Sequence, residues 1–85
     1  MRQKCLDLFE KARNNPAGLR FSELKALCVC AGFKWDRTSG SHLIFKREVP
    51  FRLLSIQNMP DGKAKPYQVR QLINFIEAIG LDRKE

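Results

Sequence analysis

The chain has 85 residues, of which 44% are hydrophobic and 29% are charged. This length allows one compact domain, residues 1–85, with a small core, and the apolar content is too high for a disordered chain. The 16 lysines and arginines outnumber the 9 acidic residues, and the formal net charge of +7 favours a polyanion such as a nucleic acid as partner.

No apolar run approaches the length of a membrane span, and the N-terminus leads into an amphipathic pattern rather than a signal peptide. We therefore expect a cytoplasmic protein without a membrane partner. No Walker or dinucleotide-binding glycine pattern is present, so no nucleotide cofactor is expected.

Two amphipathic helices are predicted in the first third of the chain. Apolar residues recur at helical spacing in residues 2–14, and a segment with Asn, Pro and Gly follows and stops this helix. Ser22 is the expected N-cap of the second helix, and Gly32 is its expected end. A glycine there allows Phe33 to fold back toward Cys28 in a Schellman-type cap.

Three cysteines, Cys5, Cys28 and Cys30, are an odd number in a chain without a secretion signal. We therefore expect reduced, buried thiols rather than disulfides. Cys28 and Cys30 are two positions apart in a helical pattern, so they point to nearly opposite sides and cannot both hold one metal ion.

Three strands are predicted in residues 33–37, 42–46 and 51–57, joined by turn-forming segments into an antiparallel meander. In the middle strand Leu43 and Phe45 alternate with His42, Ile44 and Lys46. If the first set faces the core, the second set emerges on the opposite face of the sheet.

A last helix is expected to start at Pro66 and to end at Gly80, with an apolar stripe between them. The order is then ααβββα. Because each helix has a single apolar stripe, we predict an α+β fold in which a three-stranded antiparallel sheet has helices on one face and leaves the other face open.

His42 is the only histidine and therefore the first candidate for proton transfer, since the ordinary pKa of an imidazole lies near neutrality. A single histidine cannot build a conventional zinc site here, because cysteines and carboxylates lie at unsuitable spacings. A serine triad with Ser41 is also rejected, because adjacent strand residues point to opposite faces.

Four further residues are candidates for binding a phosphate backbone. Lys63 and Lys65 flank the start of the last helix, where free backbone N–H groups favour an anion. Lys46 shares a face with His42 and could stabilise the negative charge of a transition state. Tyr67 could stack on a base or donate a proton.

Several of these features together resemble the HicA family of toxins, over about residues 20–81. They are the helix ending in Gly32 and Phe33, the three strands, the segment Gly40-Ser41-His42 between the first two, and the Lys-Pro start of the last helix. The resemblance implies a fold similar to a double-stranded-RNA-binding domain, an activity that cleaves messenger RNA, and a HicB-type antitoxin as partner. The family's glycine, serine and histidine fall on Gly40, Ser41 and His42.

The chain departs from the family pattern at two places. It has an additional helix at residues 2–14, and residues 54–57 read Leu-Ser-Ile-Gln where members often have Val-Pro-Val-His. These differences bear on substrate preference and antitoxin contacts more than on the fold.

The sequence thus predicts a metal-independent endoribonuclease in which His42 is the general acid or base and the second proton-transfer group is unidentified. A non-catalytic RNA-binding module is the first alternative. The second is a protein-interaction module whose open sheet face, with Ile44, Leu54 and Ile56, binds a partner.

Overall fold

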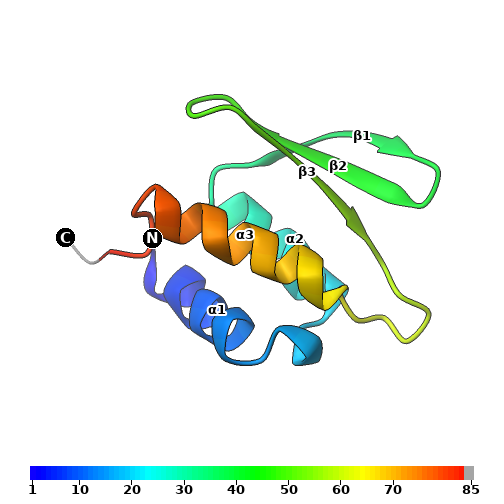
Figure 1. Cartoon of the computed structure of the whole chain (residues 1–85), viewed down its shortest axis with the longest axis horizontal. Coiled ribbons are helices and arrows are strands. Elements are labelled where there is room, and N and C mark those ends of the chain that lie inside the picture. Colours follow the sequence, from blue (N-terminus) through cyan, green and yellow to red (C-terminus); the bar gives the residue numbers. More distant parts are fainter. Residues whose placement is uncertain (84–85) are drawn as a thin grey trace.

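The computed structural model describes residues 1–83 and has helices on one side of a small sheet (Figure 1). Its elements follow in the predicted order ααβββα, with one additional 3₁₀ turn. They are α1 (Gln3–Asn14), η1 (Pro16–Gly18), α2 (Phe21–Cys30), β1 (Lys34–Ser39), β2 (His42–Arg47), β3 (Arg52–Gln57) and α3 (Pro66–Ala78).

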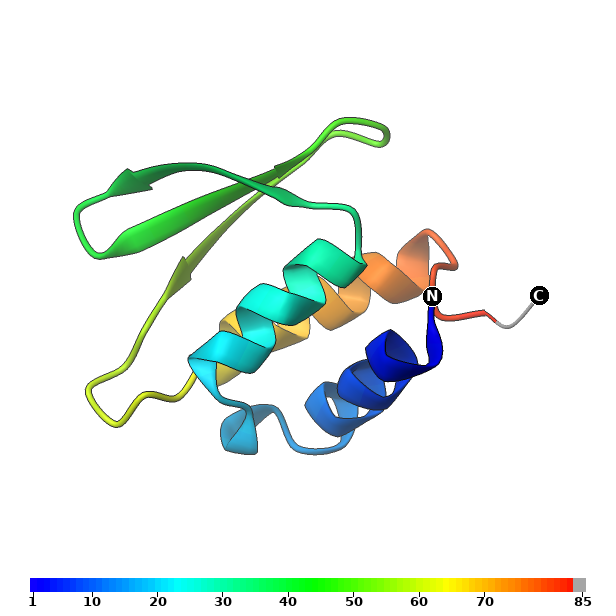
Figure 2. The same ribbon diagram turned by 180° about the vertical axis from the view of Figure 1, so that it is seen from behind.

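The three strands form an antiparallel sheet in the order β1-β2-β3. The helices lie on one side of it, and α1 packs on α2 and α3 away from the sheet (Figures 1 and 2). The other face is left open, as predicted. Among residues 1–83, every helix is too short or too polar to span a lipid bilayer.

The core lies between the sheet and the helix layer and extends to α1. Phe45 of β2 contributes from the sheet, and Leu43 packs partly against the same cluster. The other core residues are all apolar: Phe9, Ala12, Leu19, Phe21, Leu24, Leu27, Cys28, Ala31, Phe33, Leu54, Ile56, Ala64, Val69, Leu72, Ile73 and Ile76.

Helices α2 and α3 are both terminated by the predicted glycine, which lies two residues after the last helical residue. Gly32 has φ +85°, and the N–H of Phe33 donates to the carbonyl of Cys28 at 3.0 Å. The N–H of Leu81 donates to the carbonyl of Ile76 at 3.1 Å, past Gly80. These 6→1 bonds define Schellman caps and turn the chain at both helix ends.

Two predicted boundaries are wrong. Helix α2 begins at Phe21, before Ser22, because the side chain of Glu23 accepts a hydrogen bond from the Arg20 N–H at 2.9 Å and caps the helix from within its first turn. Strand β1 continues to Ser39 instead of ending at residue 37, since Thr38 and Ser39 pair with Leu43 and His42.

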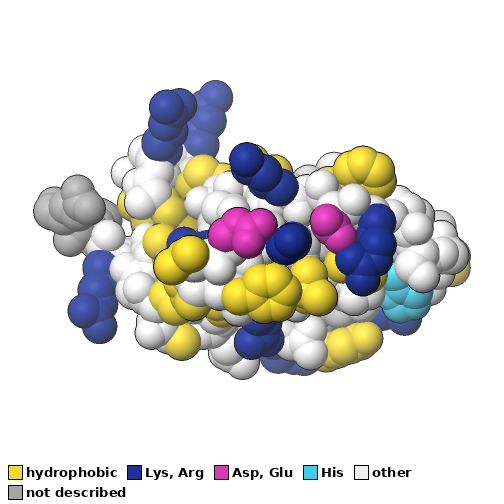
Figure 3. Space-filling model, turned by 90° about the horizontal axis from the view of Figure 1, so that it is seen from above, with side chains coloured by type: hydrophobic (Ala, Val, Ile, Leu, Met, Phe, Trp, Pro, Cys, Tyr) yellow, Lys and Arg dark blue, Asp and Glu magenta, His cyan; other side chains and the backbone are white. Residues whose placement is uncertain are grey.

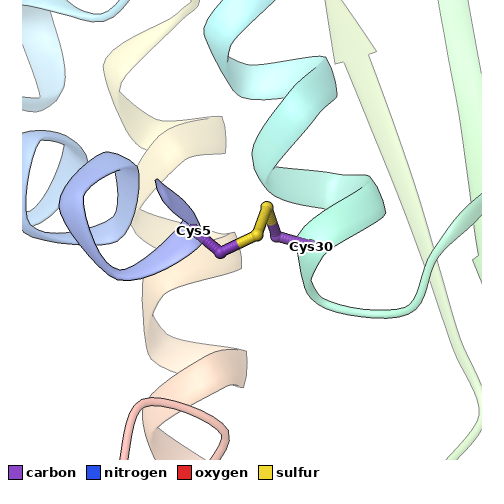
Figure 4. Close-up of a disulfide and its surroundings, with 2 residues drawn as sticks. All are labelled: Cys5 and Cys30. Atoms are coloured by element: carbon purple, nitrogen blue, oxygen red, sulfur yellow. A yellow bond between two sulfur atoms is a disulfide. The ribbon is translucent and has the colours of Figure 1, made fainter. Parts of the chain in front are cut away.

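The prediction for the cysteines is also wrong for two of the three. Cys5 of α1 and Cys30 of α2 form a disulfide, with their Cα atoms 5.7 Å apart (Figure 4). Cys28 is the buried free thiol that was expected, and burial raises its pKa to about 12. The packing of α1 on α2 brings together two cysteines that are 25 positions apart in the sequence.

Candidate active site on the open sheet face

His42 is the first residue of β2 and is placed by a tight hairpin. It pairs with Ser39 of β1, so Gly40 and Ser41 are the only residues of the turn. Gly40 has φ +59°, and no non-glycine residue among those described has a positive φ. A two-residue turn with positive φ at its first position is the II′ pattern, which requires glycine there.

The imidazole of His42 is oriented from the neighbouring strand. Its Nδ1 lies 3.0 Å from the Oγ of Ser55 on β3, at hydrogen-bond distance. A serine hydroxyl can donate or accept, so this contact can persist whether Nδ1 is protonated or not. Within residues 1–83 this is the one hydrogen bond of the ring, so Nε2 has no partner there, and the side chain is half-buried.

Further hydrogen bonds connect the hairpin turn, β3 and the start of α3 at the same end of the sheet. Gln57 is paired with His42, and its Nε2 donates to Ser41 Oγ at 2.9 Å. The N–H of Gln57 donates at 2.9 Å to Oε1 of Gln68, whose Nε2 lies 3.3 Å from the hydroxyl of Tyr67. Gln68 is the only buried polar residue among those described, so it fixes the first turn of α3 to the strand opposite His42.

The pairing register defines the residues that surround His42 on the open face. Ser39, His42 and Gln57 form one cross-strand row, and Arg37, Ile44 and Ser55 form the next. As a diagonal neighbour, Arg37 is within roughly 8 Å of His42 between backbones. Figure 3 looks onto this side and shows the only histidine at one end, next to basic side chains.

Lys46 lies on the same face but at the other end of β2. Three residues lie between Lys46 and His42, and four steps along the strand place the two backbones about 13 Å apart. Lys46 also lies 3.5 Å from the Glu48 carboxylate. Sequence reasoning chose Lys46 and missed the nearer Arg37, and it also missed Ser55, because both assignments need the strand register.

The two lysines expected to flank the start of α3 lie in different local structures. Lys65 is the N-cap residue of α3, which Pro66 begins, as predicted. Lys63 instead forms an isolated backbone bridge with Arg20, the residue before α2. Tyr67 is 55% exposed, so its ring is accessible to a ligand.

Of the three apolar residues expected on the open face, two face the core instead. Leu54 and Ile56 are buried, because they stand opposite Phe45 and Leu43 and point with them toward the helices. Ile44 does lie on the open face, opposite Ser55. The large apolar side chains that are exposed are Val29, Trp35, Val49, Phe51, Leu53 and Tyr67.

The arrangement provides one half-buried imidazole, oriented by Ser55, on a sheet face that also has basic side chains. The residues that the structure describes contain no group of three histidine, cysteine or acidic side chains placed to hold a metal ion. Two of the departures from the family pattern, Ser55 and Gln57, contact His42 and Ser41 directly.

Comparison with known proteins gives one match. The family model described as the HicA toxin of bacterial toxin–antitoxin systems matches residues 21–81, from the start of α2 to just after α3. Neither a curated protein nor a solved structure matches significantly. The match covers more than half of the chain and includes all three strands and His42, and the protein therefore belongs to the HicA family of toxins.

Proposed function

We propose that this toxin is an endoribonuclease that cleaves messenger RNA without a metal ion, with His42 as general acid or base. The observation that supports this most is the geometry of His42, whose Nδ1 is held by Ser55 while Nε2 has no partner among the described residues. A net charge of +7 favours a polyanionic substrate.

RNA contributes its own nucleophile in the proposed reaction. Nε2 of His42 takes the proton of a 2′-hydroxyl, whose oxygen attacks the adjacent phosphorus. The O2′–P bond forms, the P–O5′ bond breaks, and a proton is delivered to the leaving O5′. The products are a 2′,3′-cyclic phosphate and a 5′-hydroxyl, and no external oxidant or cofactor is needed.

The second proton and the stabilising charges come from neighbouring groups in this proposal. Arg37, a diagonal neighbour of His42 that pairs with Asp36 in the free protein, contacts the phosphate in this proposal, and Lys46, Lys63 and Lys65 hold other parts of the backbone. Tyr67 is a candidate for base stacking or for protonating O5′, because Gln68 ties it to the strand opposite His42.

The proposed protein partner is a HicB-type antitoxin. Trp35, Val49, Phe51 and Leu53 are exposed on or beside the sheet, and buried aromatic and aliphatic side chains are typical of interface cores. These residues are the surface that we assign to the antitoxin, in place of the buried Leu54 and Ile56.

Incubation of the purified protein with end-labelled RNA in excess EDTA tests the activity. We expect cleavage at the same sites and rate with and without the chelator, and products with 2′,3′-cyclic phosphate ends. Binding without cleavage would assign the protein to the non-catalytic RNA-binding modules. Cleavage that disappears in EDTA and returns with a divalent cation would refute the metal-independent mechanism.

Replacing Lys63 and Lys65 by alanine tests the proposed phosphate contacts. Each substitution should weaken RNA binding to a similar degree for different sequences and lower the slope of log affinity against log salt by about 0.7, the value per phosphate of a single strand. Folding should hardly change, since neither side chain belongs to the hydrophobic core. Lys4→Ala removes an exposed lysine of α1 and is the control. A double variant with the wild-type slope would remove both lysines from the binding site.

A further inference from the structure

A basic cleft lies between the N-terminal part of the chain and the segment before α3. It has a volume of about 450 Å³ and is lined by Lys11, Gly18, Arg20, Asp61, Gly62 and Lys63. Three side chains in this lining are cationic and one is anionic. Lys11 and Arg20 both precede residue 21, where the family match begins.

The walls of the cleft are fixed by backbone contacts. The N–H of Phe21 donates to the carbonyl of Gly62 at 3.0 Å, and the N–H of Ala64 donates to the carbonyl of Leu19 at 3.0 Å. Between these two bonds, Arg20 and Lys63 stand opposite each other in an antiparallel bridge. Binding there would require little reorganisation of the backbone.

Two of the three cations are not neutralised by the protein. Lys11 pairs with the Glu23 carboxylate at 2.6 Å, and Asp61 accepts a hydrogen bond from the backbone N–H of Lys63. Arg20 and Lys63 make no salt bridge within residues 1–83. Like charges directly opposite each other in a bridge repel, and an anion bound between them relieves the repulsion.

Backbone pairings connect this cleft to His42. His42 pairs with Gln57, the next residue Asn58 bridges to Ala64, and the adjacent Lys63 bridges to Arg20. This path has three cross-strand pairings of about 5 Å each and two steps along the chain of about 3.4 Å each. The backbones of His42 and Arg20 are therefore at most roughly 22 Å apart. A stacked strand that rises about 3.4 Å per nucleotide covers this distance in roughly six nucleotides.

We propose that the cleft binds a second phosphate of the RNA strand, several nucleotides away from the bond at His42, between the side chains of Arg20 and Lys63. Arg20 precedes residue 21, so the RNA-binding surface extends into the N-terminal segment outside the family match. This inference rests on the proposed RNA substrate. An RNA strand is favoured over an acidic protein because backbone pairings keep the cleft within roughly 22 Å of His42, a distance that one strand can span.

The test is RNA binding by Arg20→Gln and by the double variant Arg20→Gln/Lys63→Gln, measured by fluorescence anisotropy at several salt concentrations. The probe is a labelled RNA of about 12 nucleotides, twice the estimated span. Arg20→Gln should lower the salt slope by about 0.7, and the double variant should weaken binding about tenfold and lower the slope by about 1.4. Lys4→Gln carries the same charge change on α1 outside the cleft and should behave as the wild type.

The inference is overturned if the Arg20 variants show the same slope of log affinity against log salt as Lys4→Gln. It is also overturned if the wild type does not bind the RNA. Unchanged RNA binding together with weaker binding of a poly-glutamate peptide would assign the cleft to an acidic protein partner instead. Cleavage of the same RNA by the wild type is measured in parallel. If cleavage depends on His42 while the slopes do not change, the second phosphate site fails and the proposed function stands.

Discussion

Replacement of His42 by alanine is expected to lower the rate of RNA cleavage by a factor of about one hundred to ten thousand, the usual contribution of a general acid or base. RNA binding should remain close to that of the wild type, because cationic side chains elsewhere hold the phosphates. The fold should also remain, since His42 lies on the open face and fills no space in the core.

The free energy of unfolding of the alanine variant should fall by no more than about 1 kcal/mol, because only one surface hydrogen bond, to Ser55, is lost. Thermal melts and RNA titrations measure both quantities. His42→Gln is the matched control, because an amide can still bond to Ser55 but cannot transfer a proton at neutral pH. A purely structural histidine gives the opposite result, with lower stability and retained cleavage.

Loss of the Cys5–Cys30 disulfide has the largest expected effect on stability. Closing a loop of 25 residues restricts the unfolded chain and stabilises the fold by about 3.5 kcal/mol in the chain-entropy model. We expect a decrease of about 2 to 4 kcal/mol in the double variant Cys5→Ser/Cys30→Ser, measured by urea denaturation.

Reductant provides the control for this prediction. It should destabilise the wild type to a similar degree and leave the double variant unchanged. In denaturant without reductant, the wild type should titrate one thiol, Cys28, because the other two cysteines are bonded. Three thiols in the unreduced protein would show that the disulfide does not form.

Local sequence signals are sufficient to predict a structural feature that depends only on residues close together in the chain. Gly32 and Gly80 each follow an apolar stripe and end their helices through backbone bonds that span a few residues. Pro66 begins α3 because its ring suits the first helical position. The alternation of Leu43 and Phe45 with His42 also determined the exposed side of β2, since the strand period is two.

Features that depend on register or on helix packing could not be derived in this way. The contact of Ser55 with the imidazole requires the pairing of β2 with β3, which the turn between them determines and the alternation does not. The same register turns Leu54 and Ile56 toward the helices, because it sets them opposite Phe45 and Leu43. Cys5 meets Cys30 only because α1 packs on α2, and no local pattern predicts that contact.

The most direct test of the catalytic role of His42 is single-turnover cleavage of one defined RNA, in EDTA, by the wild type and by His42→Ala at saturating protein. We predict that the wild type produces cyclic phosphate ends and that the folded variant, bound to the same RNA, is at least about a hundredfold slower. Comparable rates for the two proteins would contradict the assignment of His42 as the catalytic residue.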